Sequence, residues 1–342
     1  MAAMLEQAVH FGGWRRRFSS RFSDLSDLQK EADFQARRDG AEAIGRNHVA
    51  AAEAARNRRH GLSEDRTHEL IADGVVHVAT EGRVVGQVNG LAVYDLGHHR
   101  FGKPSRITAR VGLGREGIIN IERQAGLSGP THDKGVSILT GFLRGTFARK
   151  APLAMACSVT FEQSYGGIDG DSASSTEIYA ILSALAETGL HQGIAVTGSV
   201  DQYGRVQAIG GVNEKIEGFF RVCKSHGLNG EQGVMIPGSN VLDLHLSTEV
   251  VDAVRDGRFN VWAVESIEEG IELLTGEQAG EWTDDEGWSE NSVYGRCQAR
   301  LNEMTRLMRR AAKGTKSEDI DDKNGEPGDG EDEAGGDQAH RI

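Results

Sequence analysis

A glycine-rich segment at 166–175 limits most strongly how this chain can fold, because it separates a strand pattern from a helix pattern. Residues 153–161 alternate between apolar and smaller or polar side chains, which is typical of a β-strand. Residues 177–185 are mainly apolar and are expected to continue a helix that begins near Ser172. The chain is therefore predicted to contain a strand, a glycine turn and a helix in succession, with Ser172 at the junction.

Ser172 has two interpretations at this junction. The N-terminal end of a helix is its positive end, where developing negative charge is stabilised, so the position suits a nucleophile. Ser and Asp are, however, among the commonest residues that cap a helix N-terminus, and Gly is the commonest turn residue. Taken alone, this segment favours the capping interpretation.

A second stretch places a lysine near another helix start. Residues 194–200 have a strand pattern, and after a turn 204–209 form a second strand that ends at the glycine pair 210–211. The helix after this pair carries Lys215 in about its first turn, where the positive helix end disfavours a cation. The same field, together with burial, would lower the pKa of the lysine, which suits a general base.

These two stretches together resemble the proteolytic domain of the Lon proteases, which are Ser-Lys peptidases, over roughly residues 75 to 275. The G-D-S-A-S sequence at 170–174 is similar to the B-type and C-type branches, whereas the A-type branch has a proline where this chain has Asp171. Three further motifs match the family in the same order: the T-G-S strand at 197–199, the G-x-V-x-x-I-G-G turn at 204–211 and the E-K-I-E helix at 214–217.

The resemblance implies roles for the candidate site residues. Ser172 would be the nucleophile and Lys215 the general base, which must be uncharged to accept a proton. Thr197 would orient the lysine ammonium. A β-branched residue in a strand is equally well explained by strand propensity alone. Asp169 and Asp171 are interpreted as loop and cap residues that could pair with Lys215 in a resting state. The oxyanion donors would be backbone N–H groups of this loop and helix start, including that of Ser172.

His132 precedes Asp133 and invites a comparison with Ser-His-Asp triads. Adjacent residues do not face each other, and the Lon dyad has no histidine at this place in the family. We therefore expect no catalytic role for His132.

Composition narrows the class of protein. The formal net charge of −13 argues against nucleic-acid binding, and no long basic run opposes it. The apolar runs are shorter than the roughly 18 residues of a membrane span, and the N-terminal region lacks the apolar segment of a signal peptide. The three cysteines, Cys157, Cys223 and Cys297, show no zinc or redox spacing, so we expect no metal site and a reducing, cytoplasmic location.

We expect three parts along the chain, at 1–74, 75–277 and 278–342. The first resembles the small helical lid subdomain of AAA+ ATPases, and its helices are expected at 23–34, 47–58 and 63–72. The second is the Lon-type proteolytic domain. The third is expected to contain a charged helix at 296–312 and, from Ser317 on, a disordered acidic tail.

Strand and helix patterns alternate through the second part, which predicts an α/β domain with a mixed sheet and flanking helices. Residues 75–80 and 84–94 are expected to form an antiparallel pair. Further strands are expected at 107–111, 118–121, 153–161, 194–200, 233–237 and 260–264. Besides the helices that follow 131, 172 and 211, helices are expected at 241–255 and 268–274.

A nucleotide-binding P-loop is not among the motifs of this sequence. A Walker A loop needs G-x-x-x-x-G-K-[ST], and the nearest candidate, Gly102-Lys103-Pro104, lacks both the upstream glycine and the hydroxyl residue. We therefore expect no cofactor within this chain, and ATP only if a motor domain is supplied upstream or in trans. The chain would be either the C-terminal part of a longer ATPase-protease or a family member without its own motor.

The resemblance implies a serine-type endopeptidase that degrades unfolded or misfolded proteins or peptides inside a homohexameric ring. Three alternatives stay open. The chain could be a non-catalytic assembly module with the Lon fold, or it could be a Lon-like peptidase that works without ATP. It could also be a nonfunctional fragment whose motor half is lost. The presence of both Ser172 and Lys215 favours an enzyme over the assembly module.

Overall fold

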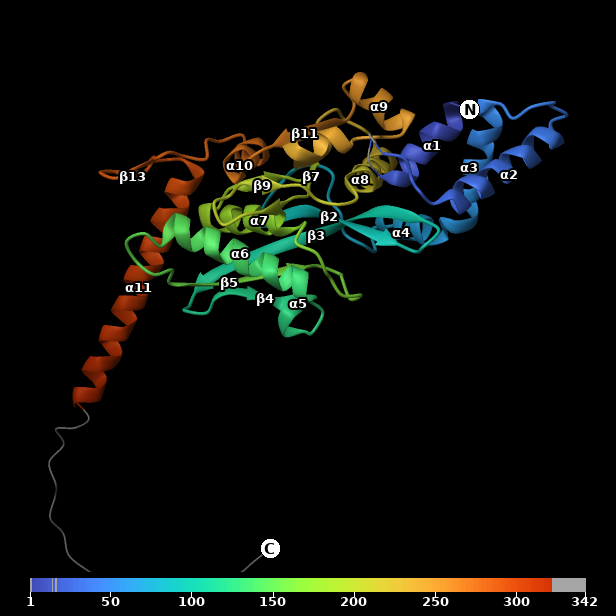
Figure 1. Ribbon diagram of the computed structural model, residues 1–342. Helices are drawn as coiled ribbons and strands as arrows, with labels where there is room; N and C mark the ends of the chain where they lie inside the picture. Colours follow the sequence, from blue (N-terminus) through green and yellow to red (C-terminus); the bar gives the residue numbers. More distant parts are fainter. Residues whose placement is uncertain (1, 14, 16, 322–342) are drawn as a thin grey trace, which may run out of the picture.

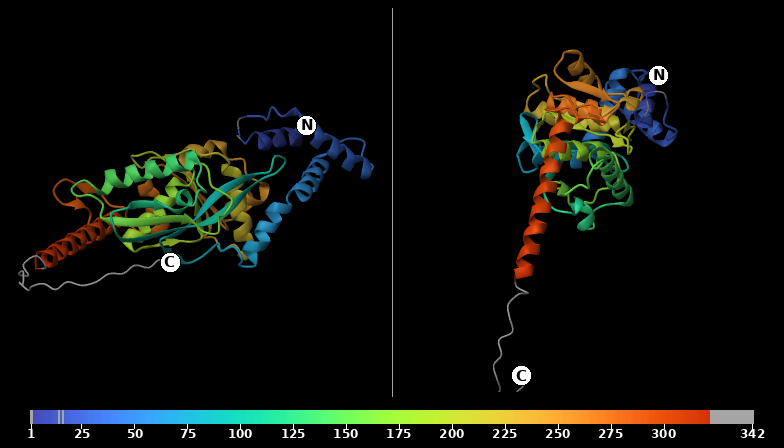
Figure 2. Two further views of the ribbon diagram at one scale, coloured as in Figure 1. Left: turned by 90° about the horizontal axis from the view of Figure 1, so that it is seen from below. Right: turned by 90° about the vertical axis from the view of Figure 1, so that its left-hand side faces the viewer.

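The computed structural model describes residues 2–13, 15 and 17–321, and for 313–321 it describes the backbone only. A helical part, an α/β part and a long C-terminal helix follow one another along the molecule (Figure 1). Figure 2 shows that the N-terminal helices and the C-terminal helix lie at opposite ends of the α/β part. No helix within the described ranges combines the length and apolarity that crossing a membrane requires.

The described residues of the N-terminal part form four helices: α1 (Ala2–Gly12), α2 (Phe22–Arg38), α3 (Arg46–His60) and α4 (Leu62–Ala72). The last three correspond to predicted helices, and α1 was not expected. A small core holds the bundle together, formed by Leu28 and Ala32 of α2 with Val49 and Ala52 of α3. Helix α4 leaves this bundle and packs against the α/β part.

A seven-stranded mixed sheet forms the centre of the α/β part, with strand order β11-β10-β7-β2-β3-β5-β4. The pairs β2/β3 and β3/β5 are antiparallel and the other neighbours are parallel, which confirms the predicted fold class. The strands are β2 (Gln87–Asp95), β3 (Arg100–Leu113), β4 (Gly117–Asn120), β5 (Met155–Phe161), β7 (Ile194–Val196), β10 (Gly233–Pro237) and β11 (Asn260–Val264). Two short ladders lie beside it: β1 (Arg83–Val85) with β6 (Gly189–His191), and β8 (Ser199–Val200) with β9 (Val206–Gln207).

Helices cover both faces of the sheet. Its α7 face is covered by α6 (Pro130–Phe147), α7 (Ser174–Ala186) and α10 (Ile267–Thr275), and its α8 face by α8 (Val212–His226) and α9 (Thr248–Arg255). In β10, Met235 joins the core on the α7 side, whereas Val234 and Ile236 join the core on the α8 side. This alternation follows from the two-residue repeat of a strand and explains why β10 is apolar throughout.

The predicted strand at 75–80 and its antiparallel pairing with 84–94 are wrong. The N–H groups of Val75 and Val76 bond to the Leu70 carbonyl and close the end of α4. The Gln163 side chain then accepts from the His77 N–H and donates to the Val75 carbonyl. Because these groups already have partners, the segment runs past the sheet without joining it, and β2 pairs with β3 instead.

The predicted helix at 241–255 is divided into a 3₁₀ turn, η1 (Gly238–Asp243), and α9. Two side chains of α8 hold the segment between η1 and α9 in an extended form. Asn213 Oδ1 accepts from the His245 N–H at 2.7 Å, and Glu217 Oε1 accepts from the Ser247 N–H at 2.7 Å. A backbone whose N–H groups are bound in this way cannot continue a helix.

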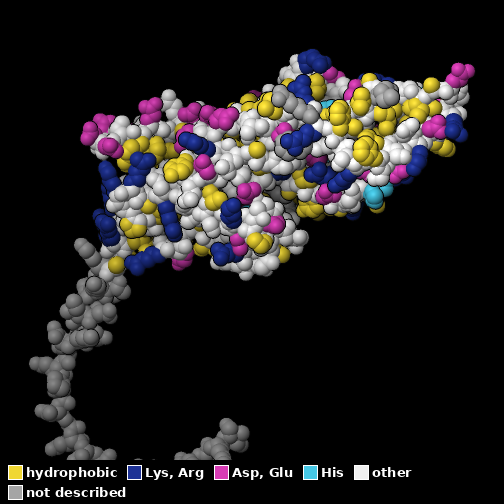
Figure 3. All heavy atoms as spheres, in the orientation of Figure 1, with side chains coloured by type: hydrophobic (Ala, Val, Ile, Leu, Met, Phe, Trp, Pro, Cys, Tyr) yellow, Lys and Arg dark blue, Asp and Glu magenta, His cyan; other side chains and the backbone are white. Residues whose placement is uncertain are grey.

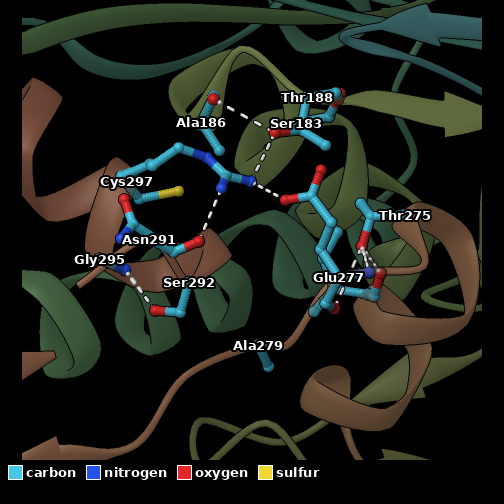
Figure 4. Close-up of polar contacts among 12 residues, drawn as sticks. Ser183, Ala186, Thr188, Thr275, Glu277, Ala279, Asn291, Ser292, Gly295 and Cys297 are labelled. Atoms are coloured by element: carbon cyan, nitrogen blue, oxygen red, sulfur yellow. Dashed lines mark hydrogen bonds and ion pairs between the residues drawn. The ribbon is translucent and has the colours of Figure 1, made fainter. Parts of the chain in front are cut away.

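A hairpin of β12 (Trp282–Thr283) and β13 (Gly287–Trp288) leads to α11 (Val293–Asp321). Helix α11 starts before the predicted 296–312 helix and continues through 317–321, the first five residues of the predicted acidic tail. The rest of that tail lies outside the described residues. Arg296 of α11 donates hydrogen bonds to Thr188, Glu277 and the Asn291 carbonyl, which fastens the start of the helix to the α/β part (Figure 4).

Candidate active site

Ser172 lies in the turn between the loop that follows β5 and the first residue of α7, Ser174. Gly170, two residues earlier, has φ of +114°, a conformation that favours glycine and turns the chain into the helix. The Ser172 carbonyl accepts from the Gly198 N–H at 2.8 Å, and the Ser175 N–H donates to the Gly198 carbonyl at 3.1 Å. These two bonds tie the serine turn to the segment between β7 and β8.

Lys215 reaches the serine from the opposite face of the sheet region. It occupies the first turn of α8, which starts after Gly211 in a left-handed conformation with φ of +69°. The residue is 3% exposed, and its Nζ donates to Ser172 Oγ at 2.9 Å and to Thr197 Oγ1 at 3.0 Å. The structure therefore brings together three side chains that the sequence analysis singled out from separate motifs.

Thr197 connects the two partners. It directly follows β7, and its backbone N–H donates to the Met235 carbonyl of β10 at 3.1 Å. This bond fixes Thr197 at the carboxyl-terminal end of β7. Its hydroxyl accepts from Lys215 and donates to the Ser172 carbonyl at 3.2 Å. A hydroxyl has one proton to donate, so this arrangement leaves its lone pairs facing the lysine.

Burial lowers the pKa of Lys215 to about 8, while the charges of Glu214 and Asp171 act in the opposite direction. Near pH 8 a large share of the amine is therefore uncharged. An uncharged amine 2.9 Å from a serine hydroxyl can accept its proton, which is the requirement for a general base.

Asp169 and Asp171 have other hydrogen-bond partners. Asp169 Oδ1 accepts from the backbone N–H groups of Thr131 at 3.0 Å and His132 at 3.3 Å, and so caps the start of α6. Asp171 Oδ2 accepts from Ser199 Oγ at 2.9 Å. Neither carboxylate forms an ion pair with Lys215 in the part of the chain that the structure describes.

The start of α7 offers backbone donors close to the serine hydroxyl. Among the described residues, the N–H groups of Asp171 and Ser172 have no protein acceptor. Free N–H groups at a helix start are suited to bind an oxyanion, because their dipoles add to that of the helix.

A buried polar cluster next to this loop was not expected from the sequence. It consists of Asn120, Glu122, His132 and Glu177, all buried, with His132 Nε2 lying 3.0 Å from Asn120 Nδ2 and 3.7 Å from Glu177 Oε1. Burial raises the pKa of Glu177 to about 8, with a further contribution from the Glu122 charge. Glu177 is the one carboxylate in the mainly apolar run 177–185, and this was the sequence signal that could have pointed to the buried polar cluster.

Other parts of the molecule offer less for chemistry. Within the described ranges, no group of three or more His, Cys, Asp and Glu side chains could hold a metal ion. A cleft of about 920 Å³ lies between the N-terminal helices and α8, and neither Ser172 nor Lys215 lines it. Its walls include basic and acidic residues such as Arg221 and Glu64, and acidic and basic side chains are also interspersed over the face in Figure 3.

Two family models match this chain. Residues 164–276 match the Lon protease (S16) C-terminal proteolytic domain, and residues 1–59 match the AAA+ ATPase LID domain of archaeal LonB. Both matches agree with the resemblances expected from the motifs. The first covers both partners of the 2.9 Å contact, Ser172 and Lys215.

Curated relatives extend the similarity. A protein of Escherichia coli (strain K12) named as a Lon protease homolog is 45% identical over 218 residues, which are 63% of this chain and 37% of that protein. One of Haemophilus influenzae with the same name is 44% identical over 220 residues, 64% of this chain and 37% of that protein. An archaeal Lon protease of Archaeoglobus fulgidus is 27% identical over 287 residues, 80% of this chain and 41% of that protein. This chain thus spans little more than a third of the first two relatives.

Proposed function

Because this chain carries the proteolytic domain of the Lon protease family, we propose that it is a serine-type endopeptidase with a Ser172–Lys215 dyad. The observation that carries the proposal is the 2.9 Å contact between Ser172 Oγ and a buried lysine amine whose pKa is lowered to about 8. A surface lysine would be protonated at neutral pH and could not accept the serine proton.

In the proposed reaction, uncharged Lys215 removes the proton of Ser172 as Oγ attacks the carbonyl carbon of the scissile peptide bond. The lysine, now an ammonium, donates this proton to the leaving amine, and an acyl-enzyme remains. Lys215 then removes a proton from water, the water attacks the ester, and the proton returns to Ser172 Oγ. Thr197 accepts from Nζ at 3.0 Å and so keeps the amine directed towards Ser172 in both charge states.

The Ser172 N–H would stabilise the oxyanion that forms during both attacks. It lies at the N-terminal end of α7, a helix of 13 residues whose dipole adds to the effect of the hydrogen bond. Loss of one such donor costs roughly a hundred- to a thousand-fold in kcat in enzymes of this type.

Substrates and assembly follow from the family resemblance. We propose unfolded or misfolded protein segments as substrates and a homohexameric ring as the working form. ATP would take part only where a motor domain is supplied upstream or in trans.

Degradation of casein tests the proposal. The wild-type chain should cleave casein, while Ser172→Ala and Lys215→Ala should reduce cleavage to background. Ser137→Ala, on the exposed side of α6, is the matched serine control and should behave as the wild type. Equal cleavage by the wild type and Ser172→Ala would rule out the dyad. A chain that cleaves nothing in any form would instead support a non-catalytic assembly module.

A further inference from the structure

Glu64 of α4 binds two elements of the α/β part at once. Its Oε2 accepts from His99 Nε2 at 2.7 Å, just before β3, and its Oε1 lies 3.0 Å from Nη1 of Arg221 in α8. His68 lies 3.6 Å from the same carboxylate. Because a carboxylate only accepts hydrogen bonds, His99 Nε2 carries a proton. The N-terminal part thus fastens the β2/β3 hairpin to the helix that carries Lys215.

The tip of this hairpin has little other support. Among residues 94–100, which form the tip, His99 is partly buried and the others are exposed. Further along β3, Gly102 packs so closely on α8 that a Cβ there would lie 2.7 Å from the Lys215 Cα. β3 is therefore fixed on α8 from Gly102 on, whereas the tip before it is held by the bond from His99 to Glu64.

The tip carries Arg100, which screens an acidic neighbour of the candidate base. Arg100 Nη1 lies 3.3 Å from Glu214 Oε1, and its Nε lies 3.3 Å from Asp95 Oδ2 across the hairpin. Glu214 precedes Lys215 in α8, and its charge opposes the lowering of the lysine pKa. A tip that moves away from α8 would take Arg100 from Glu214 and leave this charge to act on the lysine in full.

The other groups around Lys215 do not depend on the tip. Asp171, in the loop before α7, favours the ammonium form as Glu214 does. Both hydrogen-bond partners of the lysine amine are uncharged hydroxyl groups. Glu217 lines the cleft together with Glu214, and its carboxylate accepts from a backbone N–H just before α9. The pair of Arg100 and Glu214 is therefore the part of these surroundings that α4 can change.

We propose that Glu64 is a positioning residue for the base Lys215. By binding His99, it holds the hairpin tip in place and keeps Arg100 against Glu214. This inference rests on the proposed function, since it adds to the surroundings of the same base. The N-terminal part then helps to keep the lysine amine uncharged, although its own contacts lie on the far side of the hairpin tip from the reacting atoms.

The pH dependence of peptide hydrolysis by Glu64→Gln in the full chain tests this role. His99 and Arg221 bond to separate oxygens of the carboxylate, and an amide offers only one. The exposed charge of Glu214 should raise the pKa of Lys215, so we expect the midpoint of the rise in kcat/KM to move up by about 0.2–0.7 pH unit. The direction is diagnostic, because loss of the Glu64 charge acting directly on the lysine would move the midpoint down.

Asp65→Asn is the matched control. Asp65 lies next to Glu64 on α4 and pairs with Arg221 at 2.5 Å, but among the described residues its carboxylate has no bond to His99. This variant should keep the wild-type midpoint. Arg100→Gln removes the screening cation itself and should move the midpoint up at least as far as Glu64→Gln. Urea unfolding shows whether each variant keeps its fold, and Arg100→Gln tests the screening even where Glu64→Gln does not fold.

A double variant shows whether Glu64 acts through Glu214. In Glu214→Gln the charge that Arg100 screens is gone, so adding Glu64→Gln should give no shift to higher pH. An unchanged or lower midpoint in folded Glu64→Gln would overturn the inference and leave the dyad untouched, and so would an upward shift that persists in the double variant. Wild-type hydrolysis that does not rise through about pH 8, or that survives Ser172→Ala, would overturn the proposed function as well.

Discussion

Lys215 combines two properties that conflict in terms of free energy. Its side chain is buried, which disfavours the ammonium form, yet the charges of Glu214 and Asp171 favour that form. Burial dominates, so the pKa falls to about 8. Arg100 lies 3.3 Å from Glu214 and offsets part of its charge, which helps to keep the pKa low. The charge state of Lys215 therefore depends on Glu214, inside the motif that identifies the lysine, and on Arg100, outside it.

The first prediction concerns pH. In the proposed mechanism Lys215 acts in its uncharged form, so kcat/KM should rise with pH through about 8. Removing the negative charge with Glu214→Gln should lower the pKa of Lys215 and move this rise to lower pH, by less than about one unit. Rates of peptide hydrolysis measured between about pH 6 and about pH 10 give the midpoint of the rise in kcat/KM. A shift to higher pH in Glu214→Gln would contradict the assignment of Lys215 as the base.

Stability should also rise with pH, in a window that begins near pH 8. The pKa of Lys215 is about 8 in the fold, against an ordinary value of 10.5, so below pH 8 the charged lysine destabilises the fold, and this cost is relieved between pH 8 and 10.5. Lys215→Met should then raise the free energy of unfolding at pH 7 by about 1–3 kcal/mol, less what the two lost hydrogen bonds contribute.

Urea unfolding at pH 7 and at a pH near 10 measures the effect of Lys215→Met. The gain should be largest at the lower pH and shrink at the higher one, while activity is absent at both. A methionine variant that is less stable than the wild type at pH 7 would show that the hydrogen bonds of the lysine outweigh the cost of burying its charge.

At the scale of elements, strands were predictable where a single pattern decided the outcome. Residues 155–161 and 233–237 form strands as expected, because alternation or continuous apolarity reflects burial on one or two faces. Residues 75–80 have the same pattern and form no strand, because Gln163, far along the chain, binds their backbone groups. Likewise Asn213 and Glu217 interrupt the predicted 241–255 helix. Such side-chain partners cannot be predicted from local patterns.

The same limit applies to the site. Ser172, Thr197 and Lys215 were singled out through motifs, and their mutual distances depend on how β7, α7 and α8 meet. The Glu177 and His132 contact was missed, because its members come from two helices with no shared motif. Sequence motifs thus identified the residues at the reacting centre, whereas the surrounding cluster required the three-dimensional arrangement.

The position of α8 should depend on one close backbone approach. Gly218 of α8 and Gly102 of β3 touch so closely that a Cβ at 218 would overlap the Gly102 backbone. Gly218→Ala should therefore push α8 from the sheet, lower the free energy of unfolding by about 1–3 kcal/mol and reduce kcat, because Lys215 moves with the helix. Gly145→Ala in α6, where a Cβ would meet nothing within 4 Å, is the control for an alanine in a helix. Thermal unfolding and peptide hydrolysis of both variants measure these effects. If Gly218→Ala kept the stability and activity of the wild type, the position of α8 would not depend on this close approach.

At the scale of the whole molecule, the N-terminal helices meet the helix of the candidate base. Glu64 and Asp65 of α4 pair with Arg221 of α8, and Glu64 also lies 2.7 Å from His99, just before β3. Burial would raise the pKa of Glu64, but hydrogen bonds from His68 and His99 and the charge of Arg221 outweigh it and hold the pKa at about 2. The Glu64 carboxylate therefore stays charged beside Arg221 across the pH range in which the proposed enzyme would work.

The packing of the C-terminal helix α11 bears on where the proteolytic part ends. The predicted boundary at 277 stays a prediction, yet α11 buries five side chains in the same core as α7: Val293, Tyr294, Cys297, Leu301 and Met304. Burying such a side chain contributes about 1.5–3 kcal/mol. A chain that ends at 277 would lose these contacts and expose α7, whereas one that ends at 312 would keep all of them.

We therefore expect the chain that ends at 277 to be destabilised by several kcal/mol, which is comparable with the whole stability of many domains. It should bind hydrophobic dyes, unfold without a cooperative transition and lack peptidase activity, although it contains every residue of the candidate site. The chain that ends at 312 should unfold at the same denaturant concentration as the full chain and keep its activity. If the shorter chain unfolds cooperatively at that same concentration, α11 is an appendage and the boundary at 277 is correct.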